Sequence, residues 1–196
     1  DFTIFDRYLD TALKYHDPER IKIVSLIVWG RDAGNVYAGN LEKYGKGAKS
    51  GQVKVTERDP KTGEKKIMKL PVYATPECEA LLKPLLLKAK EHLESKGLAH
   101  RMMWGKSSDH YPMHSHVAML NRIVPGTPWY RDSHWNAYVF KYKEDGKEKQ
   151  VGVGATTIVW GGAVPDPAQK RLYGWRYNPK HLILNFNRAG VSCLCL

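Results

Sequence analysis

Short apolar runs that end in Trp-Gly occur three times along this chain. They span Ile23–Gly30, His100–Gly105 and Thr156–Gly161. Continuous apolar stretches of this length, rich in β-branched residues and closed by glycine, are typical of strands buried on both faces of a parallel sheet. Ligands of α/β folds bind at the carboxyl ends of such strands. We therefore expect the three indole rings to surround one mouth of the sheet, the alternative being that each ring only fills the core.

The same pattern predicts two helices in the first half of the chain. Apolar residues recur at helical spacing over Thr3–Tyr15, and the first residue of that range is a suitable N-cap. A longer helix is predicted over about 76–96, with Thr75 as its N-cap and Gly97 closing it. Pro84 lies inside this range, so we expect a kink or a break into two helices there.

Further strands and a short helix complete an alternating order of elements. The remaining strands are expected at Ala99–Trp104, Tyr138–Tyr142, Gln150–Val153 and His181–Phe186, and the short helix at Met113–Ile123. Alternation of helices and strands predicts an α/β fold with parallel strand pairing. A complete (β/α) barrel takes about 250 residues, whereas this chain has 196. We therefore expect a partial or compact (β/α) TIM-like barrel.

A basic segment interrupts this alternation at residues 41–72. Two short strands around the turn Asp59–Gly63 predict a β-hairpin insertion outside the main sheet. Leu41–Leu70 holds nine Lys or Arg against four Asp or Glu, and the whole chain carries a net charge of +11. Such an excess favours anionic partners, whether nucleic acid, an acidic polysaccharide or a lipid surface. A solvated hairpin with no partner is the alternative.

Chain length fits a single domain covering 1–196. The chain begins at Asp1 without an initiator Met and ends in the apolar run Val191–Leu196, so we expect it to be a piece of a longer polypeptide with neighbouring domains.

No apolar run approaches the roughly 18 residues of a membrane span, so we expect no membrane partner. Three cysteines make a disulfide framework improbable and leave the redox compartment open.

Motifs for bound cofactors and metals are missing from the sequence. Neither G-x-G-x-x-G nor a P-loop is present. His110, His114 and His116 are closely spaced, but Pro112 separates the first from the other two, and residues at i and i+2 point apart on a helix. We therefore expect neither a cofactor nor a metal site.

Aromatic and polar residues are concentrated in Trp129–Tyr138, which we expect to be a loop. Rings of this kind can stack on a sugar while Arg, Asn and Asp side chains recognise its hydroxyl groups. The same composition suits the stacking of bases in single-stranded nucleic acid, but the sequence contains no RNA-binding motif. The carbohydrate interpretation is therefore preferred.

Three segments together resemble a known family. They are Phe5–Leu13, Leu70–Gly97 and Arg171–Pro179, and they are similar to the (β/α) barrel of glycoside hydrolases of family 123 and its uncharacterised bacterial relatives. The resemblance implies a retaining, substrate-assisted glycosidase. In that family an adjacent Asp-Glu pair follows the strand after the long helix: the Asp orients the 2-acetamido group of the substrate and the Glu protonates the leaving oxygen. Here Asp109 matches the orienting Asp, whereas His110 stands in place of the acid.

The candidate site combines this resemblance with the aromatic pattern. Asp109 and His110 are the expected catalytic residues, and Asp132 is the second carboxylate to test. Histidine can act as a general acid near neutral pH, although glycosidases normally use a carboxylic acid with a raised pKa. The expected substrate-binding residues are Trp29, Trp104, Trp129, Asp132, His134, Trp135, Asn136 and Trp160.

The functional expectation is a glycoside hydrolase that acts on an N-acetylhexosaminide or an acidic glycan. One alternative is a non-catalytic polysaccharide-binding or structural domain derived from a glycosidase. A third alternative is a single-stranded nucleic-acid-binding protein, which rests on charge and rings alone. If the glycosidase interpretation holds, we expect a secreted or periplasmic protein.

Overall fold

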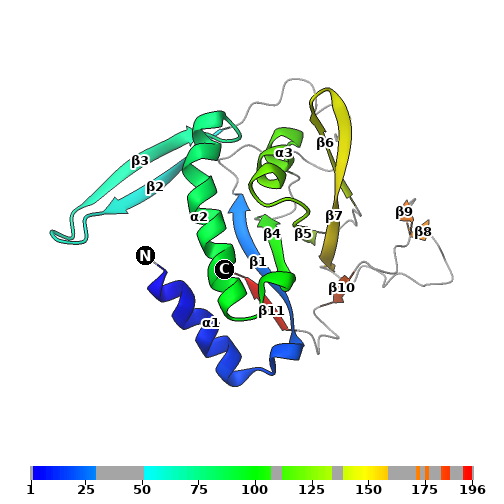
Figure 1. Ribbon diagram of the computed structural model, residues 1–196, viewed down its shortest axis with the longest axis horizontal. Coiled ribbons are helices and arrows are strands. Elements are labelled where there is room, and N and C mark those ends of the chain that lie inside the picture. The colour runs from blue at the N-terminus through cyan, green and yellow to red at the C-terminus, as the bar shows by residue number, and fades with distance from the viewer. Residues whose placement is uncertain are drawn as a thin grey trace.

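The computed structural model describes residues 2–29, 51–106, 112–133, 139–158, 171–172, 175–176, 182–185 and 192–195. Helices and strands alternate along these segments, and the long strands form one sheet (Figure 1). The protein is therefore an α/β protein, as the sequence predicts.

The central sheet is a parallel sheet with one antiparallel addition. Its order is β10-β7-β5-β4-β1-β11, every neighbouring pair in that order is parallel, and β6 pairs with β7 in the antiparallel sense. The strands are β1 (Ile21–Trp29), β4 (Met102–Lys106), β5 (Trp129–Ser133), β6 (Val139–Glu144), β7 (Lys147–Ile158), β10 (Leu182–Asn185) and β11 (Ser192–Cys195). The strands β1, β4 and β7, which contain or lead to the three Trp-Gly pairs, belong to this parallel sheet, as predicted, while Trp160 and Gly161 lie outside the described residues. In the described part of the chain β10 and β11 do not pair with each other, so the strands there form no closed barrel. The predicted parallel α/β sheet is confirmed, whereas the predicted TIM-like barrel is not.

Three helices cover one face of this sheet. They are α1 (Thr3–Tyr15), α2 (Pro76–Ser95) and α3 (His114–Ile123) (Figure 1). Their apolar side chains join those of the strands in one large core, in which Leu9, Leu93 and Leu120 are fully buried. None of the described helices is long and apolar enough to cross a membrane.

The other face of the sheet carries a second, smaller cluster. Ile23, Tyr130 and Ala155 are buried there, with Met103 packed against them. Successive residues of a strand point to opposite faces, so the neighbours of these residues, such as Val24 and Trp104, belong to the helix-covered core. Both faces of the central strands are therefore apolar, as expected for a parallel sheet.

The ends of α2 follow the predicted capping chemistry. The Thr75 hydroxyl oxygen accepts a 3.3 Å hydrogen bond from the backbone N–H of Cys78. Gly97 has φ +70°, and the N–H of Leu98 donates to the carbonyl oxygen of Leu93 at 2.8 Å. Pro84 lies inside one continuous helix, so the expected break into two helices is wrong. The predicted N-cap of α1 is also wrong, because the helix begins at Thr3 and Phe2 occupies the cap position.

The hairpin consists of β2 (Gln52–Arg58) and β3 (Lys65–Val72), which form their own two-stranded antiparallel sheet. It projects away from the body of the protein, beyond α2 (Figure 1). The Asp59 carboxylate accepts hydrogen bonds from the N–H groups of Lys61 and Thr62 at 2.7 and 2.9 Å, and these bonds shape the turn and lower the pKa of Asp59.

Several predicted boundaries in the second half of the chain need correction. The segment Trp129–Ser133, expected to be a loop, is the central strand β5. Two strands expected around Gln150–Val153 and after Thr156 are parts of the single strand β7. Residues Ala99–Arg101 form a 3-10 turn, and the strand that follows starts only at Met102.

Candidate functional site

The carboxyl ends of the parallel strands meet at one edge of the sheet. Trp29 at the end of β1 is the register partner of Lys106 at the end of β4. In the next pair, Ser133 at the end of β5 is the partner of Ile158 at the end of β7. Because β4 and β5 are themselves neighbours, these four strand ends lie in a row. This edge is the usual ligand-binding position of α/β folds.

The backbones of β1 and β4 approach closely just below this edge. A Cβ atom on Gly105 would lie 2.2 Å from the Ser25 hydroxyl oxygen and 2.4 Å from Cδ1 of Ile27. Only glycine fits between these side chains, which explains the glycine of the second Trp-Gly pair. Ser25 itself is fully buried, and its hydroxyl has no partner within the described residues.

Two of the tryptophans expected at the mouth lie in the core instead. Trp104 and Trp129 are each 1% exposed, and both belong to the cluster beneath the helices. Trp104 is in the middle of β4, opposite Leu26, while Trp129 is the first residue of β5 and packs edge-on against Phe140 with ring centroids 5.3 Å apart. A ring sealed in this way cannot stack on a sugar, so the prediction of substrate binding is corrected for these two residues.

The other expected site residues fall at the edge or outside the described part of the chain. Asp132 is in β5 as the register partner of Thr157, and Trp29 ends β1; for both, the structure describes the backbone position only. Outside the described residues lie Asp109, His110, His134, Trp135, Asn136 and Trp160. The chain therefore enters the Asp109 segment directly from the end of β4, and the aromatic segment after Ser133 directly from β5.

A buried polar cluster that the sequence did not predict supports the end of β1. The Tyr73 hydroxyl donates a 2.5 Å hydrogen bond to the carbonyl oxygen of Val28. The Tyr73 ring meets the imidazole of His116 edge-on, with centroids 4.8 Å apart. Burial lowers the pKa of His116 to about 3 and raises that of Tyr73, so both side chains are neutral at physiological pH. This cluster positions the strand end and has no charge with which to act on a substrate.

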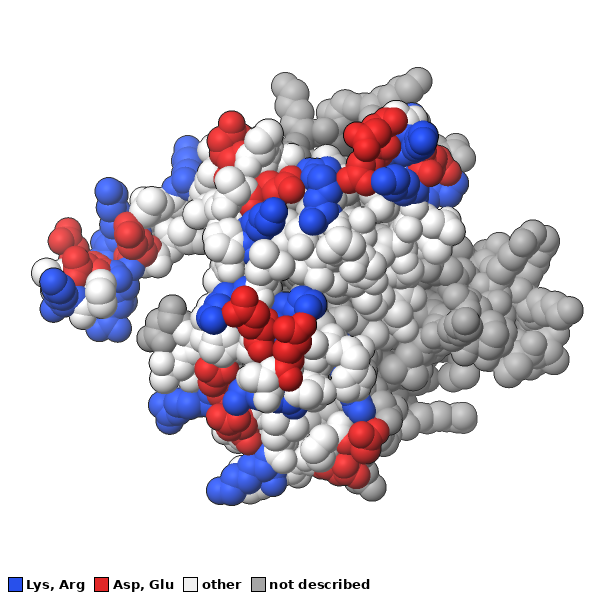
Figure 2. Space-filling view, in the orientation of Figure 1, with Lys and Arg blue, Asp and Glu red and all other residues white. Residues whose placement is uncertain are grey.

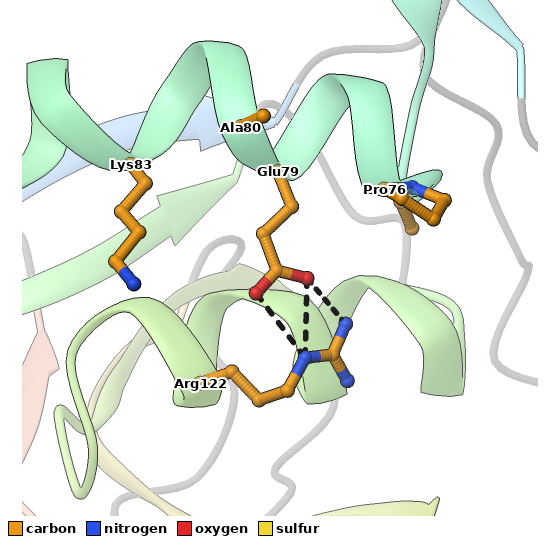
Figure 3. Close-up of a pocket in the computed structure, with 6 residues that line it drawn as sticks. Pro76, Glu79, Ala80, Lys83 and Arg122 are labelled. Atoms are coloured by element: carbon orange, nitrogen blue, oxygen red, sulfur yellow. Dashed lines mark hydrogen bonds and ion pairs between the residues drawn. The ribbon is translucent and has the colours of Figure 1, made fainter.

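A shallow pocket of about 590 Å³ lies between the start of α2 and the end of α3 (Figure 3). The Arg122 guanidinium donates to both Glu79 carboxylate oxygens at 2.6–3.3 Å. It also lies 3.9 Å from Glu144, which accepts a hydrogen bond from Lys149 at 2.6 Å. Since this charge network links α2, α3 and the β6–β7 hairpin, we assign it to the packing of these elements. Arg122 is too far in the sequence from Glu79 and Glu144 for a spacing rule to have found these two pairs.

Metal binding finds no support in the side chains that are described. His116 is fully buried, whereas His114, two positions away on α3, is exposed, so the two rings do not converge. Within the described residues no three His, Cys, Asp or Glu side chains lie close enough together to hold a metal ion.

Comparison with known families gives one match. The sequence model of the glycoside hydrolase 123 catalytic domain matches residues 1–156. No curated protein and no solved structure matches the chain. The matched region contains α1–α3 and strands β1–β6, and it ends inside β7.

Proposed function

Because this chain belongs to the glycoside hydrolase 123 family and is thus a carbohydrate-active protein of the glycoside hydrolase type, we propose that it hydrolyses N-acetylhexosaminides with the help of the substrate's own acetamido group. The site lies at the carboxyl edge of the parallel sheet. One observation supports this placement above the others: β4 and β5, the strands that lead to Asp109 and contain Asp132, are neighbouring parallel strands.

The proposed reaction needs one carboxylate and one proton donor. Asp109 holds the N–H of the 2-acetamido group, so that the carbonyl oxygen attacks the anomeric carbon as the glycosidic bond breaks. The imidazolium form of His110 gives its proton to the departing oxygen, and an oxazolinium ion remains. Neutral His110 then takes a proton from water, whose oxygen attacks the anomeric carbon and reopens the ring. The configuration at that carbon is retained, and atoms and charges balance over the two steps.

The remaining edge residues would bind the sugar. Asp132 occupies the penultimate position of β5, where a carboxylate can accept hydrogen bonds from hydroxyl groups. The rings of Trp29, Trp135 and Trp160, with the polar groups of His134 and Asn136, follow or end the strands of this edge in the sequence. Trp104 and Trp129 are not part of the proposed subsite.

Two substrates with different leaving groups test the roles separately. With 4-nitrophenyl N-acetyl-β-hexosaminide the leaving group departs without a proton, whereas an N-acetylhexosaminyl disaccharide needs one. We expect Asp109→Asn to abolish turnover of both substrates and His110→Gln to affect the disaccharide far more strongly. Proton NMR of the first-formed product should show the retained anomer.

Failure of the catalytic proposal has a distinct signature. If the purified protein binds N-acetylhexosaminides, as seen by calorimetry, but turns over neither substrate, it is a carbohydrate-binding domain derived from a glycosidase. Equal loss of both activities in His110→Gln, with unchanged stability, would contradict the assigned acid role. His16→Gln, on an exposed histidine at the end of α1, is the matched control.

A further inference from the structure

The charged side chains of the β2–β3 hairpin are divided unequally between its two faces. Residues directly opposite each other in an antiparallel pair share a face. The register places Lys54 opposite Lys69 and Arg58 opposite Lys65, with Thr56 opposite Ile67 between them. We call this set the cationic face. On the other face Val55 is opposite Met68, and Glu57 is opposite Lys66.

The cationic face contains four positive side chains and no carboxylate. All four are exposed, and in the described part of the chain none of them forms an ion pair or a side-chain hydrogen bond. Ile67 in the middle is 74% exposed, so no described part of the chain covers the centre of this face. Figure 2 shows the charged side chains of the hairpin standing clear of the main body.

Two like-charged cross-strand pairs on one face work against folding of the hairpin. Like charges directly opposite each other destabilise a strand pair, and a two-stranded sheet alone is only marginally stable in water. A bound polyanion would remove the repulsion at both pairs. The positions of Lys54 and Arg58 in β2 imply a separation of roughly 14 Å along the strand, so the face presents two separated pairs of cations to an extended ligand.

We propose that the cationic face is a docking site for an anionic polysaccharide, a glycan chain bearing carboxylate or sulfate groups. This inference rests on the proposed function, because the family assignment makes carbohydrate the ligand class. Charge complementarity selects an anionic glycan, and Lys and Arg head groups suit both carboxylates and sulfates. The bound part of the glycan would lie along the hairpin, at a distance from the catalytic edge. It would thereby hold the rest of the polysaccharide to the enzyme.

Other polyanions fit the same face less well. Single-stranded nucleic acids bind through rings that stack on bases, and the six residues of this face include no aromatic side chain. Anchoring in a lipid surface requires an apolar face with large side chains, and here Ile67 stands alone among cations. A glycan needs only the cations that are present.

A charge-matched pair of variants tests the proposal. Lys54→Gln/Lys69→Gln removes two charges from the cationic face, and Lys66→Gln/Lys147→Gln removes two exposed charges elsewhere. The probes are chondroitin sulfate, hyaluronate, neutral dextran, a single-stranded oligonucleotide and vesicles containing anionic phospholipid. We expect the first variant to bind chondroitin sulfate or hyaluronate roughly tenfold more weakly than wild type, and the second to bind almost as wild type does. Dextran should not bind.

Each outcome separates the docking site from the catalytic proposal. Turnover of the small neutral 4-nitrophenyl substrate should be equal in wild type and both variants, because it does not reach the hairpin. Equal loss of glycan binding in both double variants would overturn the docking site, since only net charge would matter. Tighter binding of the oligonucleotide or the vesicles through the same residues would also overturn it. Docking without turnover in the wild type would contradict the catalytic proposal alone.

Discussion

The hydroxyl group of Tyr73 donates a 2.5 Å hydrogen bond to the carbonyl oxygen of Val28. Tyr73 stands between the hairpin and α2, and Val28 is next to the last residue of β1. The bond therefore ties the start of the longest helix to the strand end that borders the candidate site. Through this bond Tyr73, which takes no part in the proposed reaction, should influence the shape of the carboxyl edge of the sheet.

Replacing Tyr73 tests directly what this hydrogen bond contributes to stability. In Tyr73→Phe the ring remains, but the partly buried carbonyl of Val28 loses its side-chain donor. We expect the free energy of unfolding to fall by about 1–3 kcal/mol, measured by urea denaturation. Tyr15→Phe, at an exposed tyrosine, should leave stability unchanged. Equal effects of the two substitutions would mean that the hydrogen bond contributes nothing.

Gly105→Ala should be destabilising because its Cβ has no space. The new methyl group would lie 2.2 Å from the Ser25 hydroxyl oxygen, and crowding of this kind in a packed core costs typically about 1–3 kcal/mol. Gly152→Ala in β7 is the matched control, since no atom lies within 4 Å of its added Cβ. Thermal unfolding followed by circular dichroism gives both values. Partial recovery of stability in Gly105→Ala/Ser25→Gly would identify the hydroxyl as the obstacle.

Trp104→Phe should affect stability and leave sugar recognition unchanged. The indole is buried beneath the helices, and its N–H has no partner within the described residues. We expect a loss of about 1–3 kcal/mol from the smaller ring, while KM for the chromogenic substrate stays within about twofold of wild type. A large rise in KM with unchanged stability would return Trp104 to the binding site.

Acid should destabilise the protein through His116. Burial lowers the pKa of its imidazole to about 3 in the folded state, whereas the unfolded value is about 6.5. Between these values the unfolded chain binds the proton and the folded chain does not. The stability that depends on a neutral His116 is therefore fully present above about pH 6.5. As the pH drops below this value the free energy of unfolding falls, by up to roughly 1.4 kcal/mol per pH unit.

The measurement compares urea unfolding of wild type and His116→Phe from pH 4 to pH 8. The difference in unfolding free energy between the two proteins should change with pH only in the acid range. His16→Gln, on an exposed residue, should follow the wild-type curve. If His116→Phe does not fold, the imidazole resonances of the wild type decide the question: titration of His116 near pH 6.5 would contradict its burial as a neutral ring.

Local sequence pattern was sufficient for the elements that depend on local chemistry. Thr75 and Gly97 bracket α2 as their capping preferences require, and the apolar run Ile21–Trp29 is a strand of the parallel sheet. Charge and turn residues likewise located the hairpin, because Asp59 forms its turn within a few residues. In each case the determining contacts lie close together in the chain.

Tertiary context decided the features that the sequence did not predict. Trp129–Ser133 is rich in polar residues, yet it is a central strand because Trp129 is covered by Phe140 and Tyr130 packs on the opposite face. The direction in which Trp104 points depends on strand alternation, which a Trp-Gly pair does not reveal. The Glu79–Arg122 pairing joins two helices and likewise has no local signal.

The first and last described strands, β1 and β11, lie side by side in the sheet, although almost the entire chain separates them. Contacts of such large sequence separation raise the contact order and slow folding. During synthesis on the ribosome, this side of β1 has no partner until Ser192–Cys195 has emerged. An unpaired strand of this kind can join other chains, so the nascent protein is most exposed to aggregation just before synthesis reaches that strand.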